Sequence, residues 1–166
     1  MSVGTLVPLA EYLATEYEPD VEYVDGVLVE RNVGDWLHSL IQRNLIVAVS
    51  RKYPHLFAVP ELRSRTKETR YRLPDVSVLL QPPGTRFLLA AAHIAIEILS
   101  EDDRMSQVLE KLAEYEAAGV AHIWLVDPRL DLLSVYRAGD LNSVETLSTA
   151  DGIELTREEV FAGKSA

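Results

Sequence analysis

The sequence predicts an α/β fold with a central mixed β-sheet flanked by helices, for two reasons. First, two apolar segments of strand length, residues 94–99 and 121–126, are separated by a helical pattern over residues 104–118. This order is typical of parallel strands joined by a crossover helix. Second, hairpin signals precede this unit, so antiparallel strands are also expected.

Turn and cap residues divide the first half of the chain. Asp25-Gly26 is typical of a two-residue hairpin turn, and Asp35 is typical of a helix N-cap. After Asp35, apolar residues recur at helical spacing to about Lys52, and this period is lost after Pro54. The predicted elements are a helix over 8–15, strands over 21–24 and 27–30, a helix over 35–52, and strands over 56–65 and 69–72 that can form a second hairpin.

The second half begins with a strand over 75–80 and a Pro/Gly-containing loop over 81–86. Ser100 to Asp103 supply predicted cap residues for the helix that ends at Gly119. The remaining predicted elements are strands over 94–99, 121–126 and 132–137, an edge strand over 144–147, and a short helix opened by a capping box at 156–159.

Length and composition exclude several classes of protein. The 166 residues are expected to form a single domain over 1–166. No apolar run approaches the roughly 18 residues needed to span a membrane, and residues 1–10 lack the features of a secretory signal. The absence of cysteine excludes disulfides and thiolate metal sites. We therefore expect a cytoplasmic protein.

The charge balance argues against nucleic-acid binding, because the net charge is −10. One local cluster is basic and lies just ahead of the strand at 75–80. Its members are Arg63, Arg65, Lys67, Arg70 and Arg72. The cluster either faces a phosphate backbone or forms a solvated hairpin of mixed charge, since acidic residues are interspersed.

Two acidic residues in strand-like apolar segments indicate a metal site. Asp75 is expected to share a face with Ser77, and Glu97 with Ala95. A buried carboxylate is costly without a cationic partner, and oxygen ligands are those that Mg²⁺ prefers. The acids thus either hold one divalent cation between neighbouring strands or pair with arginines and solvent.

Lys111 is the candidate cation on the following helix. It lies just beyond the edge of the apolar stripe marked by Val108 and Tyr115, where its side chain can reach along the sheet. The alternative is a surface lysine paired with Glu114.

Several short motifs, in their order and spacing, resemble the Uma-type putative restriction endonuclease family, which is similar to the PD-(D/E)XK nuclease superfamily. The likeness covers the chain from about Leu6 to Arg137. The motifs are Glu22-Tyr23-Val24-Asp25-Gly26, Arg72-Leu73-Pro74-Asp75-Val76, Glu97-Ile98-Leu99-Ser100, Lys111, Tyr115 ahead of Gly119-Val120, and Trp124-Leu125-Val126-Asp127-Pro128.

The resemblance implies a restriction-endonuclease-like fold and an endonuclease that hydrolyses DNA with Mg²⁺ or Mn²⁺. It makes Asp75 and Glu97 metal ligands and Lys111 the lysine that assists the attacking water. The superfamily's usual lysine position, two residues after the second acid, holds Leu99 here. Lys111 matches members in which the lysine has moved to the next helix. A further acid is expected, either Glu22 or Glu61.

Two strands of a duplex are most simply cut by two active sites, so a homodimer is expected. The alternative function is a non-catalytic nuclease-like domain that binds a partner, which the acidic balance and Leu99 favour.

Histidine and tryptophan add less to the predicted site. His38 lies near the edge of its helix's apolar stripe, either as a boundary residue or close to the metal. His55, His93 and His122 show no ligand spacing, so a histidine-rich metal site is not expected. Trp36 and Trp124 are expected in the core.

Overall fold

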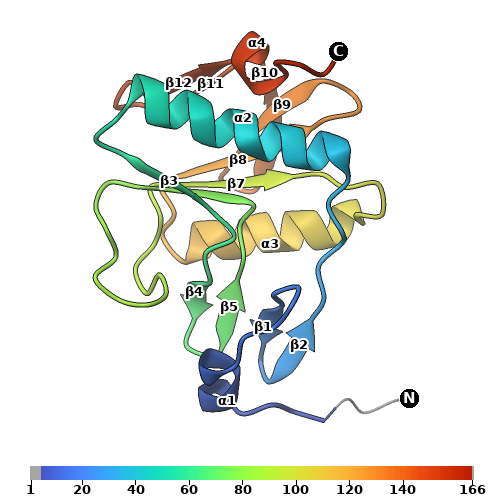
Figure 1. Cartoon of the computed structure of the whole chain (residues 1–166), viewed down its shortest axis with the longest axis vertical. Coiled ribbons are helices and arrows are strands. Elements are labelled where there is room, and N and C mark those ends of the chain that lie inside the picture. The colour runs from blue at the N-terminus through green and yellow to red at the C-terminus, as the bar shows by residue number, and fades with distance from the viewer. Residues whose placement is uncertain (1–4, 166) are drawn as a thin grey trace.

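The computed structural model describes residues 5–165 (Figure 1). Residues 1–4 and 166, which belong to the single domain expected over 1–166, lie outside the described residues. The helices are α1 (Leu9–Ala14), α2 (Trp36–Lys52), α3 (Met105–Ala117) and α4 (Arg157–Val160). No helix in this range is long and apolar enough to cross a membrane.

The central sheet has six strands in the order β10-β9-β8-β7-β6-β3. Only β7 and β8 are parallel within it, and α3 connects them. The predicted crossover and mixed sheet are confirmed. Its strands are β3 (Phe57–Pro60), β6 (Val76–Leu79), β7 (Ile94–Ile98), β8 (His122–Asp127), β9 (Leu132–Arg137) and β10 (Asp140–Val144).

Helices cover both faces of this sheet (Figure 1). On one face, apolar side chains of α2 and α4 pack on Ile94, Ile96 and Ile98 of β7. On the other face, Leu112 and Tyr115 of α3 pack on the alternate side chains of the sheet, which include Ala95. Because side chains alternate along a strand, Glu97 shares the α3 face with Ala95.

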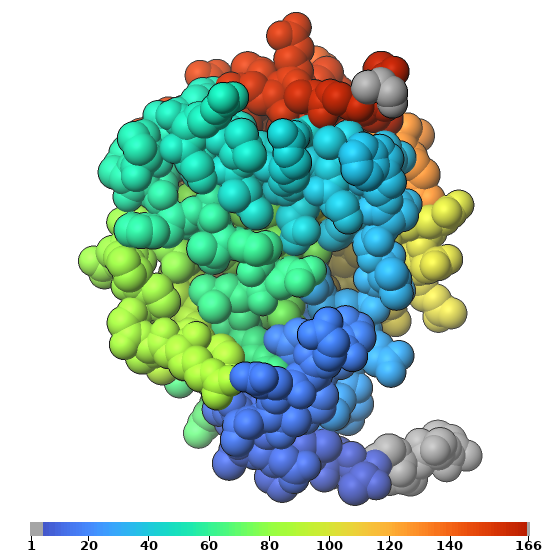
Figure 2. All heavy atoms as spheres, in the orientation of Figure 1, coloured from blue at the N-terminus to red at the C-terminus, as the bar shows by residue number. Residues whose placement is uncertain are grey.

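A four-stranded sheet, in the order β2-β1-β5-β4, forms the end of the molecule that carries α1 (Figure 1). Figure 2 shows the N-terminal segment at this same end, away from α2 and the C-terminal segment. A small apolar core at this end of the molecule consists of Tyr12, Val21, Tyr23 and Tyr71. The strands of this sheet are β1 (Glu22–Val24), β2 (Val27–Val29), β4 (Ser64–Lys67) and β5 (Arg70–Arg72). The sheet carries Glu22 and Arg72, which line a cavity described below.

Several local predictions are confirmed. Asp25-Gly26 connects β1 to β2, and the Asp35 carboxylate caps α2 by accepting from His38 N at 2.9 Å. Thr156 opens α4 with a capping box.

The single strand predicted over 56–65 is wrong. The chain breaks after β3 at Glu61, which has a positive φ of 48°. β3 then pairs with β6 in the central sheet, whereas β4 pairs with β5 as the second hairpin.

The predicted cap for α3 is also wrong, since Arg104 is the N-cap and makes no side-chain cap bond. Asp103 instead accepts from Ser100 N and from Asn32. Trp124 lies in the core as expected, but Trp36 is 70% exposed because it begins α2 on the side away from the sheet.

The edge strand predicted over 144–147 is divided between two pairings. β10 pairs with β9 across a turn at Ala138-Gly139, both with positive φ. β11 (Thr146–Ser148) pairs with β12 (Glu154–Thr156) in a separate two-stranded sheet. The polar sequence of β10 concealed its strand character.

Candidate active site

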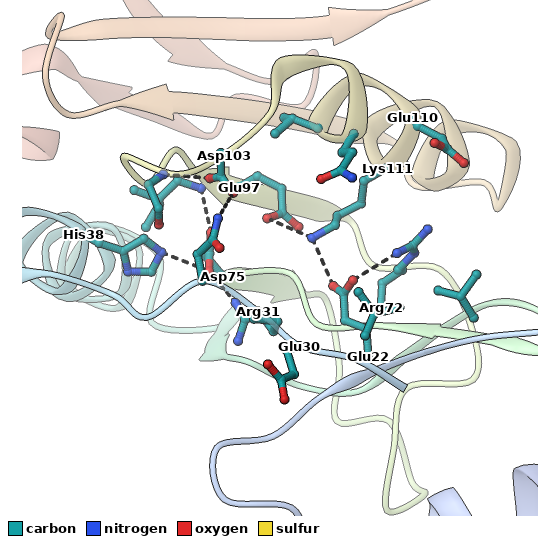
Figure 3. Close-up of a pocket in the computed structure, with 17 residues that line it drawn as sticks. Glu22, Glu30, Arg31, His38, Arg72, Asp75, Glu97, Asp103, Glu110 and Lys111 are labelled. Carbon is teal, nitrogen blue, oxygen red and sulfur yellow. Dashed lines mark hydrogen bonds and ion pairs between the residues drawn. The ribbon is translucent and has the colours of Figure 1, made fainter. Parts of the chain in front are cut away.

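A cavity of about 310 Å³ lies where the central sheet, the start of α2, the helix α3 and the four-stranded sheet meet (Figure 3). Carboxylates outnumber permanent cations on its wall, so it favours cations. The acids are Glu22, Glu30, Asp75, Glu97, Asp103 and Glu110, and the bases are Arg31, Arg72 and Lys111, with His38 beside them.

The register of β6 and β7 brings the two predicted acids together. Val76 pairs with Ile96 in an antiparallel ladder, so the next position along sets Asp75 opposite Glu97. Both side chains line the same cavity and are buried. The structure therefore places the Asp75 and Glu97 side chains opposite each other on the wall of one cavity.

Asp75 is surrounded by donors. Its Oδ1 lies 2.6 Å from Arg31 Nη2 and 3.1 Å from His38 Nε2, and its Oδ2 accepts from Ile98 N at 2.7 Å. Burial would raise the pKa of Asp75, but the His38 and Arg31 contacts outweigh burial and lower it. Asp75 is thus an ionised carboxylate.

Glu97 is far less well compensated. It accepts from the Tyr115 hydroxyl at 2.5 Å, and its Oε2 is 3.8 Å from Lys111 Nζ. Burial is the main reason that its pKa is raised to about 8, and the nearby carboxylates of Asp75 and Glu22 raise it further. Glu97 is a buried carboxyl group, and the attraction of the Lys111 ammonium offsets only part of the cost of its burial.

Lys111 enters the cavity from α3 (Figure 3). Its Nζ lies 3.1 Å from Glu22 Oε1, on the same side as Glu97. Burial would lower the pKa of Lys111, but Glu97 and Glu22 raise it above its ordinary value, so the ammonium persists. The alternative surface pair with Glu114 is not formed, because Glu114 binds Arg70 and Arg72 instead.

The choice between Glu22 and Glu61 is clear from their positions. Glu22 is buried in the cavity wall and also accepts from Leu73 N at 3.0 Å and Arg72 Nη1 at 3.0 Å. Glu61 is half exposed and contacts only the far side of Arg31, at 3.1 Å. Of the two expected acids, Glu22 therefore lines the cavity and Glu61 does not.

Comparison with known proteins identifies the family. A family model described as "Uma2: Putative restriction endonuclease" matches residues 9–165, which include every charged residue of the cavity. The chain belongs to the Uma2 family. The comparison with curated proteins found no match.

A solved structure has a similar fold. It is a putative nuclease belonging to DUF820 from Anabaena variabilis ATCC 29413, 24% identical, with a TM-score of 0.80. The likeness covers 94% of this chain and 98% of that chain. The restriction-endonuclease-like fold expected from the sequence is confirmed.

The basic cluster of this Uma2 chain mostly forms internal ion pairs. Arg63 binds Asp20 at 2.6 Å, Arg70 binds Asp25 at 2.6 Å, and Arg72 bridges Glu22 and Glu114. Only Arg65 and Lys67 of the five are exposed. The mixed-charge interpretation of this hairpin therefore fits its geometry better than a continuous phosphate-binding face.

Sequence reasoning missed Arg31 and left His38 open. Arg31 follows β2 in a segment without a motif, yet it reaches Asp75 across the cavity. His38 is in the first turn of α2, where its ring faces the same carboxylate (Figure 3). The position of His38 at the edge of the apolar stripe of its helix pointed to the site. No sequence pattern pointed to Arg31.

The donor set of the cavity fits a hard divalent cation. Asp75 and Glu97 offer carboxylate oxygens from adjacent strands, and the Lys111 ammonium compensates the burial of Glu97 only in part. Mg²⁺ is commonly held by one or two carboxylates and several waters, which a cavity of about 310 Å³ can contain. To bind an ion, Asp75 would exchange its contact with Arg31 or His38.

Proposed function

We propose that this protein is a Mg²⁺-dependent endonuclease, also served by Mn²⁺, that hydrolyses phosphodiester bonds in DNA. One observation carries the proposal: Asp75 and Glu97 lie opposite each other on β6 and β7, with the Lys111 ammonium beside Glu97. Membership of the Uma2 family supports a nuclease function.

Asp75 and Glu97 would hold the metal ion between them. When bound, the ion would polarise the scissile phosphate and lower the pKa of the attacking water. Tyr115 fixes the orientation of Glu97, and Ile98 N fixes that of Asp75. These contacts position both carboxylates before any substrate arrives.

Lys111 acts as a donor in this proposal. In the ion-free protein, Glu97 and Glu22 raise its pKa, which favours the protonated ammonium. It can donate hydrogen bonds to the attacking water or to a phosphate oxygen, offsetting the negative charge that grows in the transition state. Glu22 holds the ammonium in place through the 3.1 Å contact.

The acidic character of the cavity gives the ion a second role. Six carboxylates line it against three permanent cations, so a phosphate backbone would be repelled from the ion-free cavity. Binding of a divalent cation would reverse much of this repulsion next to Glu97. Substrate binding should therefore depend on the ion, in addition to the chemical step.

Cleavage of supercoiled plasmid, single-stranded DNA and RNA of the same sequence, with Mg²⁺, Mn²⁺ or EDTA, tests the proposal. We expect metal-dependent cutting of DNA that falls about 10³-fold in Asp75→Asn and about 10²-fold in Lys111→Ala. Equal nicking by wild type and both variants would reject the enzyme. Cutting of RNA alone would reject the substrate.

A homodimer is part of the proposal, because it would bring two such sites to the two strands of a duplex. Light scattering on the purified protein should give twice the mass of 18.5 kDa. A monomer that still makes double-strand breaks would contradict this part alone.

A second candidate is a nuclease-like domain that binds a partner without cutting. One observation favours it: both Asp75 oxygens are engaged, by Arg31, His38 and Ile98 N. Calorimetry with Mg²⁺ separates the two, since the second candidate predicts no Asp75-dependent ion binding.

A further inference from the structure

A second cluster of potential metal ligands lies at the opposite end of β7 from Glu97. It contains His93, His122 and Asp151, which come from three separate segments. His93 precedes β7 by one residue and Glu97 is four residues further on. At about 3.3 Å per residue, the two places are therefore about 13 Å apart.

The parallel pairing of β7 and β8 brings the two histidines together. Ile94 pairs with His122, and His122 N donates to His93 O at 3.0 Å. The His93 backbone is also held by β6, because its N donates to Val78 O at 3.0 Å. The imidazole rings meet edge to face with centroids 5.0 Å apart. The fold thus brings together two histidines whose sequence spacing gave no sign of a shared site.

Asp151 joins them from the turn between β11 and β12. Its Oδ2 is 3.0 Å from His93 Nε2, and its Oδ1 is 3.9 Å from His122 Nε2. The turn is ordered by Thr149, whose N donates to Ile153 O and whose hydroxyl accepts from Ile153 N. One ligand atom from each residue lies within 4.8 Å of the other two.

We propose that His93, His122 and Asp151 bind a divalent transition-metal ion of the Zn²⁺ class. Imidazole nitrogen and carboxylate oxygen are ordinary zinc ligands, at about 2.0 to 2.2 Å, so ligands of one tetrahedral ion stand about 3.3 to 3.6 Å apart. The two distances to Asp151 bracket that range. Three protein ligands leave the remaining position for water.

The surroundings of the cluster suit such an ion better than Mg²⁺. Two of the three ligands are nitrogens, which Mg²⁺ and Ca²⁺ disfavour. The side chains are only partly covered, with His93 13%, His122 23% and Asp151 50% exposed, so an ion can enter.

The predicted consequence is a metal-dependent clamp. The ion would connect the turn between β11 and β12 to the sheet end formed by β7 and β8, which are otherwise linked there through the His93–Asp151 contact. Anything that binds only the folded state stabilises it, so unfolding should become metal-dependent. The nuclease cavity lies elsewhere and does not enter this inference.

Calorimetry with Zn²⁺, the visible absorption of Co²⁺, and thermal unfolding of the EDTA-treated full chain test the clamp. We expect one Zn²⁺ per chain, a four-coordinate Co²⁺ spectrum and a higher unfolding temperature with Zn²⁺ in wild type. His93→Ala, His122→Ala and Asp151→Asn should each weaken Zn²⁺ binding at least tenfold. His55→Ala, which changes an exposed histidine elsewhere, should match wild type.

The double variant Asp75→Asn/Glu97→Gln separates the two sites, because it should keep Zn²⁺ binding in full. Zn²⁺ binding that is lost in this variant but kept in His122→Ala would overturn the inference. If wild type binds no Zn²⁺, the inference is also overturned. The contact between His93 and Asp151 would then be a hydrogen bond without a role in metal binding. If His93→Ala does not fold, Asp151→Asn, on an exposed turn, gives the same test.

Discussion

Glu97 and Glu114 are two equally buried carboxylates on facing elements, at 7% and 5% exposure, yet their surroundings are opposite. Glu114 accepts from Arg72 twice, at 3.1 and 2.8 Å, from Arg70 at 3.2 Å and from Thr66 at 2.5 Å. Burial would raise the pKa of Glu114, but these donors outweigh it and lower it. The pKa of Glu97 is raised to about 8.

The difference separates a carboxylate whose charge is balanced inside the protein from one that, in our proposal, binds a metal ion. Glu114 joins the four-stranded sheet to α3, and its charge is fully compensated within the protein. Glu97 has Tyr115 and a lysine at 3.8 Å, which leaves its negative charge under-compensated. An incoming cation can supply what is missing, and strongly perturbed acids of this kind concentrate at functional sites.

The largest expected effect is on cleavage. Glu97→Gln removes a proposed metal ligand and should lower the cleavage rate by about 10³-fold, whereas Glu114→Gln should lower it less than tenfold below its unfolding temperature. Initial rates on supercoiled plasmid with Mg²⁺ measure both. Similar losses of cleavage rate in the two variants would contradict different roles for Glu97 and Glu114.

Stability should change in the opposite order. Glu114→Gln removes the partner that Arg72 and Arg70 share, although Arg72 keeps Glu22 and Arg70 keeps Asp25, so the loss should be about 1.5 to 3 kcal/mol. Glu97→Gln should instead raise the free energy of unfolding at pH 7, because wild type must take up a proton on Glu97 to fold there, whereas glutamine is neutral in both states. Urea denaturation in EDTA gives both values. A larger loss in Glu97→Gln would contradict the assignment.

Glu97 and Glu114 should contribute to the pH dependence of stability with opposite signs. The folded protein binds the Glu97 proton more tightly than the ordinary pKa of 4.5 allows, so stability falls as pH rises from about 4.5 to about 8. His38, whose raised pKa starts from 6.5, acts in the same direction above that pH. Glu114 has a lowered pKa, so its contribution is present above pH 4.5 and lost in acid.

Unfolding at several pH values in EDTA measures these slopes. Glu97→Gln should keep only the smaller decline due to His38, and Glu114→Gln should lose part of the acid sensitivity. A wild-type stability that rises steadily from pH 5 to pH 8 would show that Glu97 is ionised throughout.

The smallest expected effect concerns Arg31. Its guanidinium occupies Asp75 Oδ1 at 2.6 Å and so competes with an ion for that oxygen. Arg31→Ala should tighten Mg²⁺ binding by about threefold, the scale of a single partly exposed ion pair. Calorimetry measures the Mg²⁺ affinity of each variant. Arg65→Ala, at an exposed arginine, is the matched control. Weaker binding in Arg31→Ala would instead make Arg31 a helper of the ion.

Local patterns in the sequence were enough for the elements around the site. The alternation on β7 set Glu97 apart from Ile96 and Ile98, and the stripe of α3 put Lys111 at its edge. Asp35 and Asp25-Gly26 marked a helix start and a turn correctly because caps and tight turns depend on neighbouring residues alone. The family likeness added the roles of Asp75, Glu97 and Lys111, which remain to be tested.

Long-range contacts were decided only by the tertiary structure. Arg31 reaches Asp75, Glu22 rather than Glu61 holds Lys111, and His93 meets His122 and Asp151. None of these pairs has a spacing that local periodicity can report, because strand register and the packing of separate sheets bring them together. A sequence determines which residues face the core; only the folded chain determines which charges then meet.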